Sequence, residues 1–261
     1  MSEPRNYQTE AIIIKKTKLG EADRILTLYT PHLGRIQAVA KGVRRPRSKL
    51  SGHLELLTHS QVSLARGKNL ATVTGSQTID SFIVIKSDLE LTSYALYITE
   101  LLHKFTEEHI ENSPLFQLLL ETLKQLEKGS NNEPLLRYFE LHLLGYVGYR
   151  PQLQHCVLCH SPLSTGTNSF SATAGGMLCH KCSSPQPFTY NLSADGFRTL
   201  RLLQDGKIDV ASQLKTEQQT TDELQWIMRN YIGYLLEREI KSAAWLDALK
   251  QHSQKGQIAL L

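Results

Sequence analysis

The feature that most constrains this chain is its set of four cysteines, which form two C-x-x-C pairs separated by nineteen residues: Cys156, Cys159, Cys179 and Cys182. A C-x-x-C turn brings two sulfur atoms to the same side of a tight loop. Two such turns complete the tetrahedron of thiolates that structural zinc prefers. Because cysteines would fill all four coordination positions, none remains for water or a substrate. The spacing therefore predicts a structural, non-catalytic Zn²⁺ site.

Other uses of these cysteines fit the sequence less well. Two disulfides would require an oxidising compartment, and no apolar run is long enough for a signal peptide or a membrane span. We therefore expect a cytoplasmic, nucleoid-associated protein with reduced thiols. A thioredoxin-like pair would need one C-x-x-C at a strand-to-helix junction, whereas these pairs flank the Ser/Thr/Gly-rich loop 161–176. Replacement of a cysteine ligand by His155, His160 or His180 is possible, but loop histidines usually face solvent.

Short alternating segments fill the first eighty residues. Val62 and Leu64 alternate with Ser63 and Ala65, as is typical of a half-buried strand. The predicted strands are 7–16, 23–30, 35–41, 54–65 and 70–77. Five short, antiparallel-looking strands predict a small closed barrel of the OB type over residues 1–82. An SH3-like barrel would fit the strand count nearly as well.

From Asp88 onward the apolar period becomes helical, and helix signals resume after the cysteines. Ser193 is a plausible N-cap, and Thr220-x-x-Glu223 has the pattern of a capping box. The predicted fold class is therefore α+β, with an N-terminal OB-fold β-barrel followed by an α-helical domain that carries a four-cysteine zinc-binding insertion. The helical domain is expected in two parts, 83–150 and 189–261, on either side of the zinc-binding segment 151–188.

Positive charge is concentrated at the amino-terminal end. Residues 1–80 contain thirteen Lys/Arg against six Asp/Glu, whereas the rest of the chain has sixteen against nineteen. Residues 35–49 carry six positive charges and no acid, and Gly42 and Pro46 prevent a regular helix there. Such a loop on a barrel suits phosphate oxygens. The predicted DNA-binding residues are Arg24, Arg35, Lys41, Arg44, Arg45, Arg47, Lys49, Arg66 and Lys68.

Two observations limit this interpretation of the basic residues. A solvated charged loop would look the same, and strand-edge solubility explains Arg24, Arg66 and Lys68 equally well. Only Tyr7, Tyr29 and Phe82 lie in or beside the strands, fewer aromatic platforms than single-strand binders usually offer. We therefore expect binding through the nucleic-acid backbone, to single strands and duplex alike, with little sequence preference.

These residues resemble a known family over nearly the whole chain, from about residue 7 to 250. The segments 9–14, 19–25 and 40–45 resemble the amino-terminal domain of the bacterial recombination mediator family RecO. The run Tyr149-Arg150-Pro151 before the first cysteine pair, and Gly175-Gly176-Met177-Leu178 before the second, resemble that family's zinc segment.

The resemblance implies an OB-fold domain, a helical domain with a zinc insertion, and a DNA-repair mediator without a catalytic residue. Such a mediator binds single- and double-stranded DNA, anneals complementary strands and helps RecA displace single-strand binding protein. The implied partners are RecR and the acidic C-terminal tail of single-strand binding protein, with RecA acting indirectly. Some family members lack the cysteines, whereas this chain retains all four.

Two alternatives belong to other functional classes. His53-x-Glu55 with the first cysteine pair superficially resembles a zinc nucleobase deaminase. The segments are about a hundred residues apart, no proline precedes Cys156, and the second cysteine pair would fill the open coordination position. The other alternative is a zinc-stabilised protein-binding adaptor with incidental DNA affinity.

Overall fold

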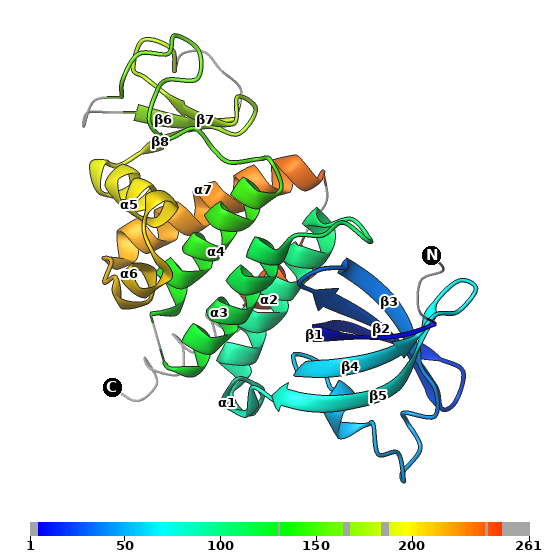
Figure 1. Cartoon of the computed structure of the whole chain (residues 1–261). Helices are drawn as coiled ribbons and strands as arrows, with labels where there is room; N and C mark the ends of the chain where they lie inside the picture. The colour runs from blue at the N-terminus through cyan, green and yellow to red at the C-terminus, as the bar shows by residue number, and fades with distance from the viewer. Residues whose placement is uncertain (1–4, 130, 164–167, 184–187, 238–239, 247–261) are drawn as a thin grey trace, which may run out of the picture. The chain divides into compact units, whose positions relative to one another are not determined.

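A computed structural model of the chain describes residues 5–129, 131–163, 168–183, 188–237 and 240–246 (Figure 1). The described residues form two compact units, one ending at Glu127 and the other beginning at Lys128. None of the described helices combines the length and hydropathy needed to cross a bilayer.

The first unit contains a closed five-stranded barrel. Its strands are β1 (Asn6–Leu19), β2 (Asp23–Thr30), β3 (Gly34–Ala40), β4 (His59–Ala65) and β5 (Ala71–Asp80). They follow one another around the barrel in the order β1-β2-β3-β5-β4, and β4 pairs back onto β1. Only the β3–β5 contact is parallel. This five-stranded Greek-key order confirms the predicted OB-type barrel over the SH3-like alternative.

Alternation of side chains along the strands builds the barrel core. On β3, Ile36, Ala38 and Ala40 belong to the buried core, and Leu26 and Leu28 join them from β2. The predicted strand 54–65 is shorter than expected, because residues 52–54 form a 3₁₀ turn and Leu57 adopts a positive φ of 62°. The chain therefore turns across the barrel end before β4 begins.

Three helices complete the first unit, namely α1 (Ile83–Ser87), α2 (Leu89–Phe105) and α3 (Ser113–Glu127). The Asp88 carboxylate caps α2 by accepting a hydrogen bond from the backbone N–H of Leu91. Phe116 of α3 packs against Tyr29 and His59 of the barrel, with ring centroids 6.5 and 6.0 Å apart. The compact unit therefore extends beyond the barrel.

The second unit is a group of helices, and a small sheet is inserted in the chain after the first of them and lies beyond the helix ends (Figure 1). The helices are α4 (Asn132–Tyr146), α5 (Ala194–Asp205), α6 (Ile208–Gln213) and α7 (Gln218–Leu236). The sheet strands are β6 (Asn168–Ser171), β7 (Gly176–Leu178) and β8 (Thr189–Leu192), in the order β7-β6-β8.

The helix caps of this unit agree only partly with the sequence signals. Ser193 is the N-cap of α5, as predicted, and its Oγ accepts from the Gly196 N–H at 3.0 Å. The predicted capping box is wrong, because α7 begins at Gln218 and Thr220 lies inside it. Glu223 instead accepts hydrogen bonds from the backbone N–H and the hydroxyl of Ser193, at 2.8 and 2.5 Å. It therefore fastens α7 to the start of α5.

Candidate metal centre and nucleic-acid interface

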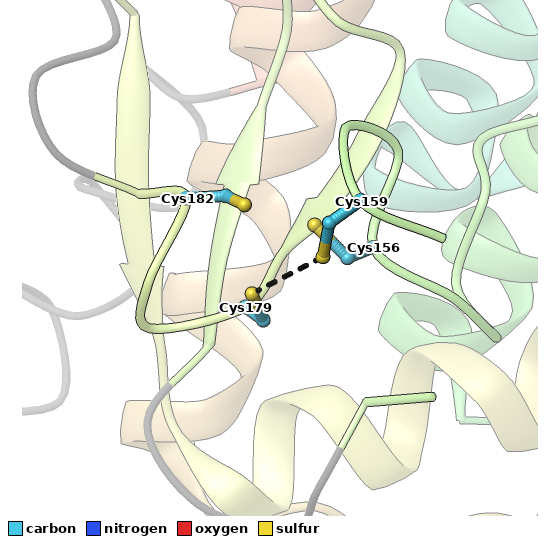
Figure 2. Close-up of side chains that lie close together, drawn as sticks. All are labelled: Cys156, Cys159, Cys179 and Cys182. Carbon is cyan, nitrogen blue, oxygen red and sulfur yellow. Dashed lines mark hydrogen bonds between the residues drawn. The ribbon is translucent and has the colours of Figure 1, made fainter. Parts of the chain in front are cut away.

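The four cysteines lie on two tight turns whose sulfur atoms face one another (Figure 2). All four Sγ atoms lie within 4.8 Å of one another, and those of Cys159 and Cys179 are 3.7 Å apart. Tetrahedral Zn²⁺ with Zn–S bonds of about 2.3 Å requires sulfurs about 3.8 Å apart. The donor set is also appropriate, because four thiolates are among the ligand sets that zinc takes in structural sites. The residues present therefore fit a four-coordinate structural ion.

Backbone hydrogen bonds hold the two turns in place. The His160 N–H donates to the Cys156 carbonyl, and the Cys182 N–H donates to the Cys179 carbonyl, each at 2.9 Å. The Val157 N–H donates to the Met177 carbonyl at 2.9 Å, which places the first turn beside β7, the strand that leads into the second turn. The three histidines His155, His160 and His180 are exposed and lie outside the cysteine cluster.

Hydrogen bonds distribute charge unevenly among the thiols. The Ser161 hydroxyl lowers the pKa of Cys159 to about 6, whereas a hydrogen bond with Cys159 raises the pKa of Cys182 to about 12. Burial raises the pKa of Cys156, but N–H groups of the two turns outweigh it and lower that pKa overall. The cluster thus favours thiolate at Cys159 and Cys156, the form that binds a metal.

The basic loop, defined here as residues 41–49, leaves the end of β3 and is fixed to the β1–β2 turn. The Arg44 N–H donates to the Ala22 carbonyl at 2.9 Å, and its guanidinium contacts the Gly20 carbonyl at 3.3 Å. The Gly42 N–H donates to Asp23 Oδ1 at 2.7 Å. The predicted DNA-binding residues of this loop are all exposed, namely Lys41, Arg44, Arg45, Arg47 and Lys49.

Three other predicted DNA-binding residues lie at the start of β2 or in the β4–β5 turn. Arg24 lies opposite Ala40, beside the start of the basic loop. Arg66 and Lys68 lie exposed in the β4–β5 turn, and β5 then begins beside Ala38 of β3. The β1–β2 turn, the basic loop and the β4–β5 turn therefore all adjoin the second half of β3.

Arg35 differs from the other eight predicted residues. Its Nε donates to the Thr106 carbonyl at 3.1 Å, and its terminal nitrogen lies 3.3 Å from both His103 Nδ1 and Glu108 Oε1. Only 13% of its side chain is exposed. This guanidinium joins β3 to the end of α2, and the sequence offered no signal for that contact because Glu108 is 73 residues away.

The aromatic residues near the strands offer little surface to a nucleobase. Tyr29 and Phe82 are fully buried, and burial raises the pKa of the Tyr29 hydroxyl. Tyr7 is partly covered by the Arg66 guanidinium, 5.4 Å from its ring centroid. These three side chains therefore offer little exposed ring surface for base stacking.

The residues of the deaminase-like pattern have other roles. His53 Nδ1 lies 2.8 Å from Thr78 Oγ1 and fixes the 3₁₀ turn against β5. Glu55 forms an ion pair with Lys16. Neither residue belongs to the cysteine cluster, which contains its own four donors.

Comparisons with known proteins cover both units. The family model described as recombination protein O N terminal matches residues 1–82, and recombination protein O C terminal matches residues 86–244. The chain is 46% identical over 250 residues to the DNA repair protein RecO of Dehalococcoides mccartyi strain CBDB1, covering 96% of this chain and 98% of that protein. It is 42% identical over 247 residues to the DNA repair protein RecO of Roseiflexus sp. strain RS-1, covering 95% and 87% respectively.

Proposed function

This chain belongs to the RecO family, and on that premise we propose that it is a mediator of DNA repair and homologous recombination. In this role it binds single- and double-stranded DNA and anneals complementary strands. It also helps load RecA onto DNA coated with single-strand binding protein. No covalent chemistry is required of it, and the sequence contains no Gly-x-x-x-x-Gly-Lys phosphate loop for ATP.

The exposed basic loop is the observation that supports DNA binding most directly. Five cations project from a segment without an acid, and its backbone is fixed to the β1–β2 turn. Held by their phosphates, two strands repel each other less while their bases search for pairing. If about five cations neutralise phosphates, the logarithm of the single-strand binding constant falls with log salt at a slope of about −3.5. A fourfold rise in salt then weakens binding roughly a hundredfold.

The metal has a structural role in this proposal. Cys156, Cys159, Cys179 and Cys182 would hold Zn²⁺, which when bound supplies a cross-link between the two turns. The chain's own contribution is to hold the sulfurs close to tetrahedral spacing and to favour the thiolate form at Cys159 and Cys156.

RecR and the acidic tail of single-strand binding protein are the proposed protein partners. RecA is an indirect partner. The proposal places the protein in the cytoplasm, associated with the nucleoid. These partners follow from the family relationship, and no residues are assigned to them.

Replacement of Arg44, Arg45 and Arg47 together by alanine tests the proposed DNA binding. We expect weaker binding to labelled single-stranded DNA, a shallower salt dependence and slower annealing of complementary strands, with and without single-strand binding protein. Replacement of Lys124 and Lys128, two exposed lysines that are not part of the basic loop, provides the control. Unchanged DNA affinity in the triple variant would favour the adaptor function instead.

A further inference from the structure

The outer face of β2 and β3 is the surface on which OB folds commonly bind oligonucleotides, together with the β1–β2 and β4–β5 turns. On β3 this face carries Arg35, Gln37 and Val39, because the alternate residues point into the core. In this chain the α2–α3 connection, residues 106–112, pairs with the edge of β3 at Arg35, and its Glu108 side chain reaches Arg35 and Gln37 on that face.

Several contacts fasten this connection to the barrel. The His109 N–H donates to the Arg35 carbonyl at 3.0 Å, and Gln37 donates to Glu108 Oε1 at 2.5 Å. The Ser113 hydroxyl donates to the Pro31 carbonyl at 2.6 Å. At Gly34 the approach is so close that an added Cβ would lie 2.0 Å from the Ile110 carbonyl oxygen.

The closed part of the face is unfavourable for nucleic acid in two ways. The connection occupies space against β3, and Glu108 places a carboxylate where a phosphate would otherwise meet Arg35 and Gln37. A DNA backbone would have to displace these hydrogen bonds and approach a negative charge. The basic residues around the second half of β3 present neither obstacle.

Two exposed lysines of β1 lie on opposite sides of the boundary between the covered part of this face and the surrounding basic residues. Lys15 pairs with Thr27, which pairs with Gln37, so Lys15 shares the outer face with the covering connection. Lys18 pairs with Arg24, which pairs with Ala40, a residue of the inward face. Ala40 leads directly into the basic loop, and Arg44 of that loop is hydrogen-bonded to the β1–β2 turn just after Lys18. The odd spacing of three residues places the two lysines on opposite faces of the strand.

We propose that DNA follows a track around the end of the barrel, and that Lys18 belongs to this track whereas Lys15 does not. The track consists of the β1–β2 turn, the basic loop and the β4–β5 turn, and its ligand is the sugar–phosphate backbone. This inference rests on the proposed DNA-binding function and specifies its path. Because the closed face offers no platform for bases, single strands and duplex use the same phosphate contacts.

Lysine footprinting of the unmodified protein tests the track. The protein is acetylated with a succinimidyl ester at low salt, with and without an oligo(dT) strand or a duplex, and each lysine is quantified by mass spectrometry. We expect both DNAs to protect Lys18, Lys41, Lys49 and Lys68. Lys15 and the control Lys124 should react equally with and without DNA.

Salt titrations of two single variants provide an independent measurement. Lys18→Ala should make the salt slope shallower by about 0.7 for single strands and about 0.9 for duplex, the loss of one phosphate contact. Lys15→Ala, with the same charge change on the same strand, should leave both slopes unchanged. Protection of Lys15 equal to that of Lys41, or equal slopes in the two variants, would overturn the track. Protection of no lysine would instead refute the proposed DNA binding itself.

Discussion

Arg35→Ala should loosen the contact between the barrel and the α2–α3 connection while leaving DNA binding largely intact. The substitution removes hydrogen bonds from a mostly buried guanidinium to the Thr106 carbonyl and the Glu108 carboxylate. The Glu108 bond contributes little, because 38% of that side chain is exposed and water replaces the lost partner. The Thr106 carbonyl loses a charged donor, so the total cost is about 2 kcal/mol.

Hydrogen exchange at the His109 amide is the appropriate assay, because this N–H donates to the Arg35 carbonyl and reports opening of the connection. A cost of about 2 kcal/mol corresponds to roughly thirtyfold faster exchange. Arg45→Ala is the matched control, since Arg45 is exposed in the basic loop. It should leave the exchange unchanged and weaken DNA binding. Native exchange in Arg35→Ala together with a loss of DNA affinity equal to that of Arg45→Ala would refute this reasoning and place Arg35 among the DNA contacts.

Three further predictions concern the metal, pH and one glycine. Cys179→Ser should remove zinc from the purified protein and lower its melting temperature first, affecting DNA binding only indirectly; normal melting without zinc would contradict a structural role. Burial lowers the pKa of His59, so the unfolded chain binds that proton more tightly. Stability should therefore be full above about pH 6.5 and decrease as the pH falls below it. His59→Gln should flatten this decrease in denaturant titrations, and an unchanged pH dependence would exclude His59 as its source. Gly34→Ala should destabilise the protein more than Gly20→Ala, because both glycines have positive φ but only Gly34 faces the Ile110 carbonyl. Equal melting temperatures for these two variants would show that the α2–α3 connection moves away from the added methyl group without loss of stability.

The parts of this molecule that were predictable from sequence are those specified by local patterns. Alternation along the strands predicts the barrel, and two C-x-x-C turns predict the clustered sulfurs, because each signal lies within a few residues of the structure it specifies. The fourth strand was predicted too long since Leu54 and Leu57 are apolar yet lie in a turn across the barrel end. Apolar character alone does not distinguish a strand residue from a buried turn residue.

Roles that depend on distant partners were not predictable in the same way. Glu223 fits a local capping pattern, yet it caps α5 through Ser193, thirty residues earlier. Arg35 looks like the first cation of a basic run, yet its guanidinium meets Glu108 on the α2–α3 connection. In both cases a charged side chain pairs with a group that the fold brings close, and a local pattern does not specify that pairing. A run of cations therefore predicts where phosphate binding is concentrated, whereas strand register and tertiary contacts decide which cations are available for it.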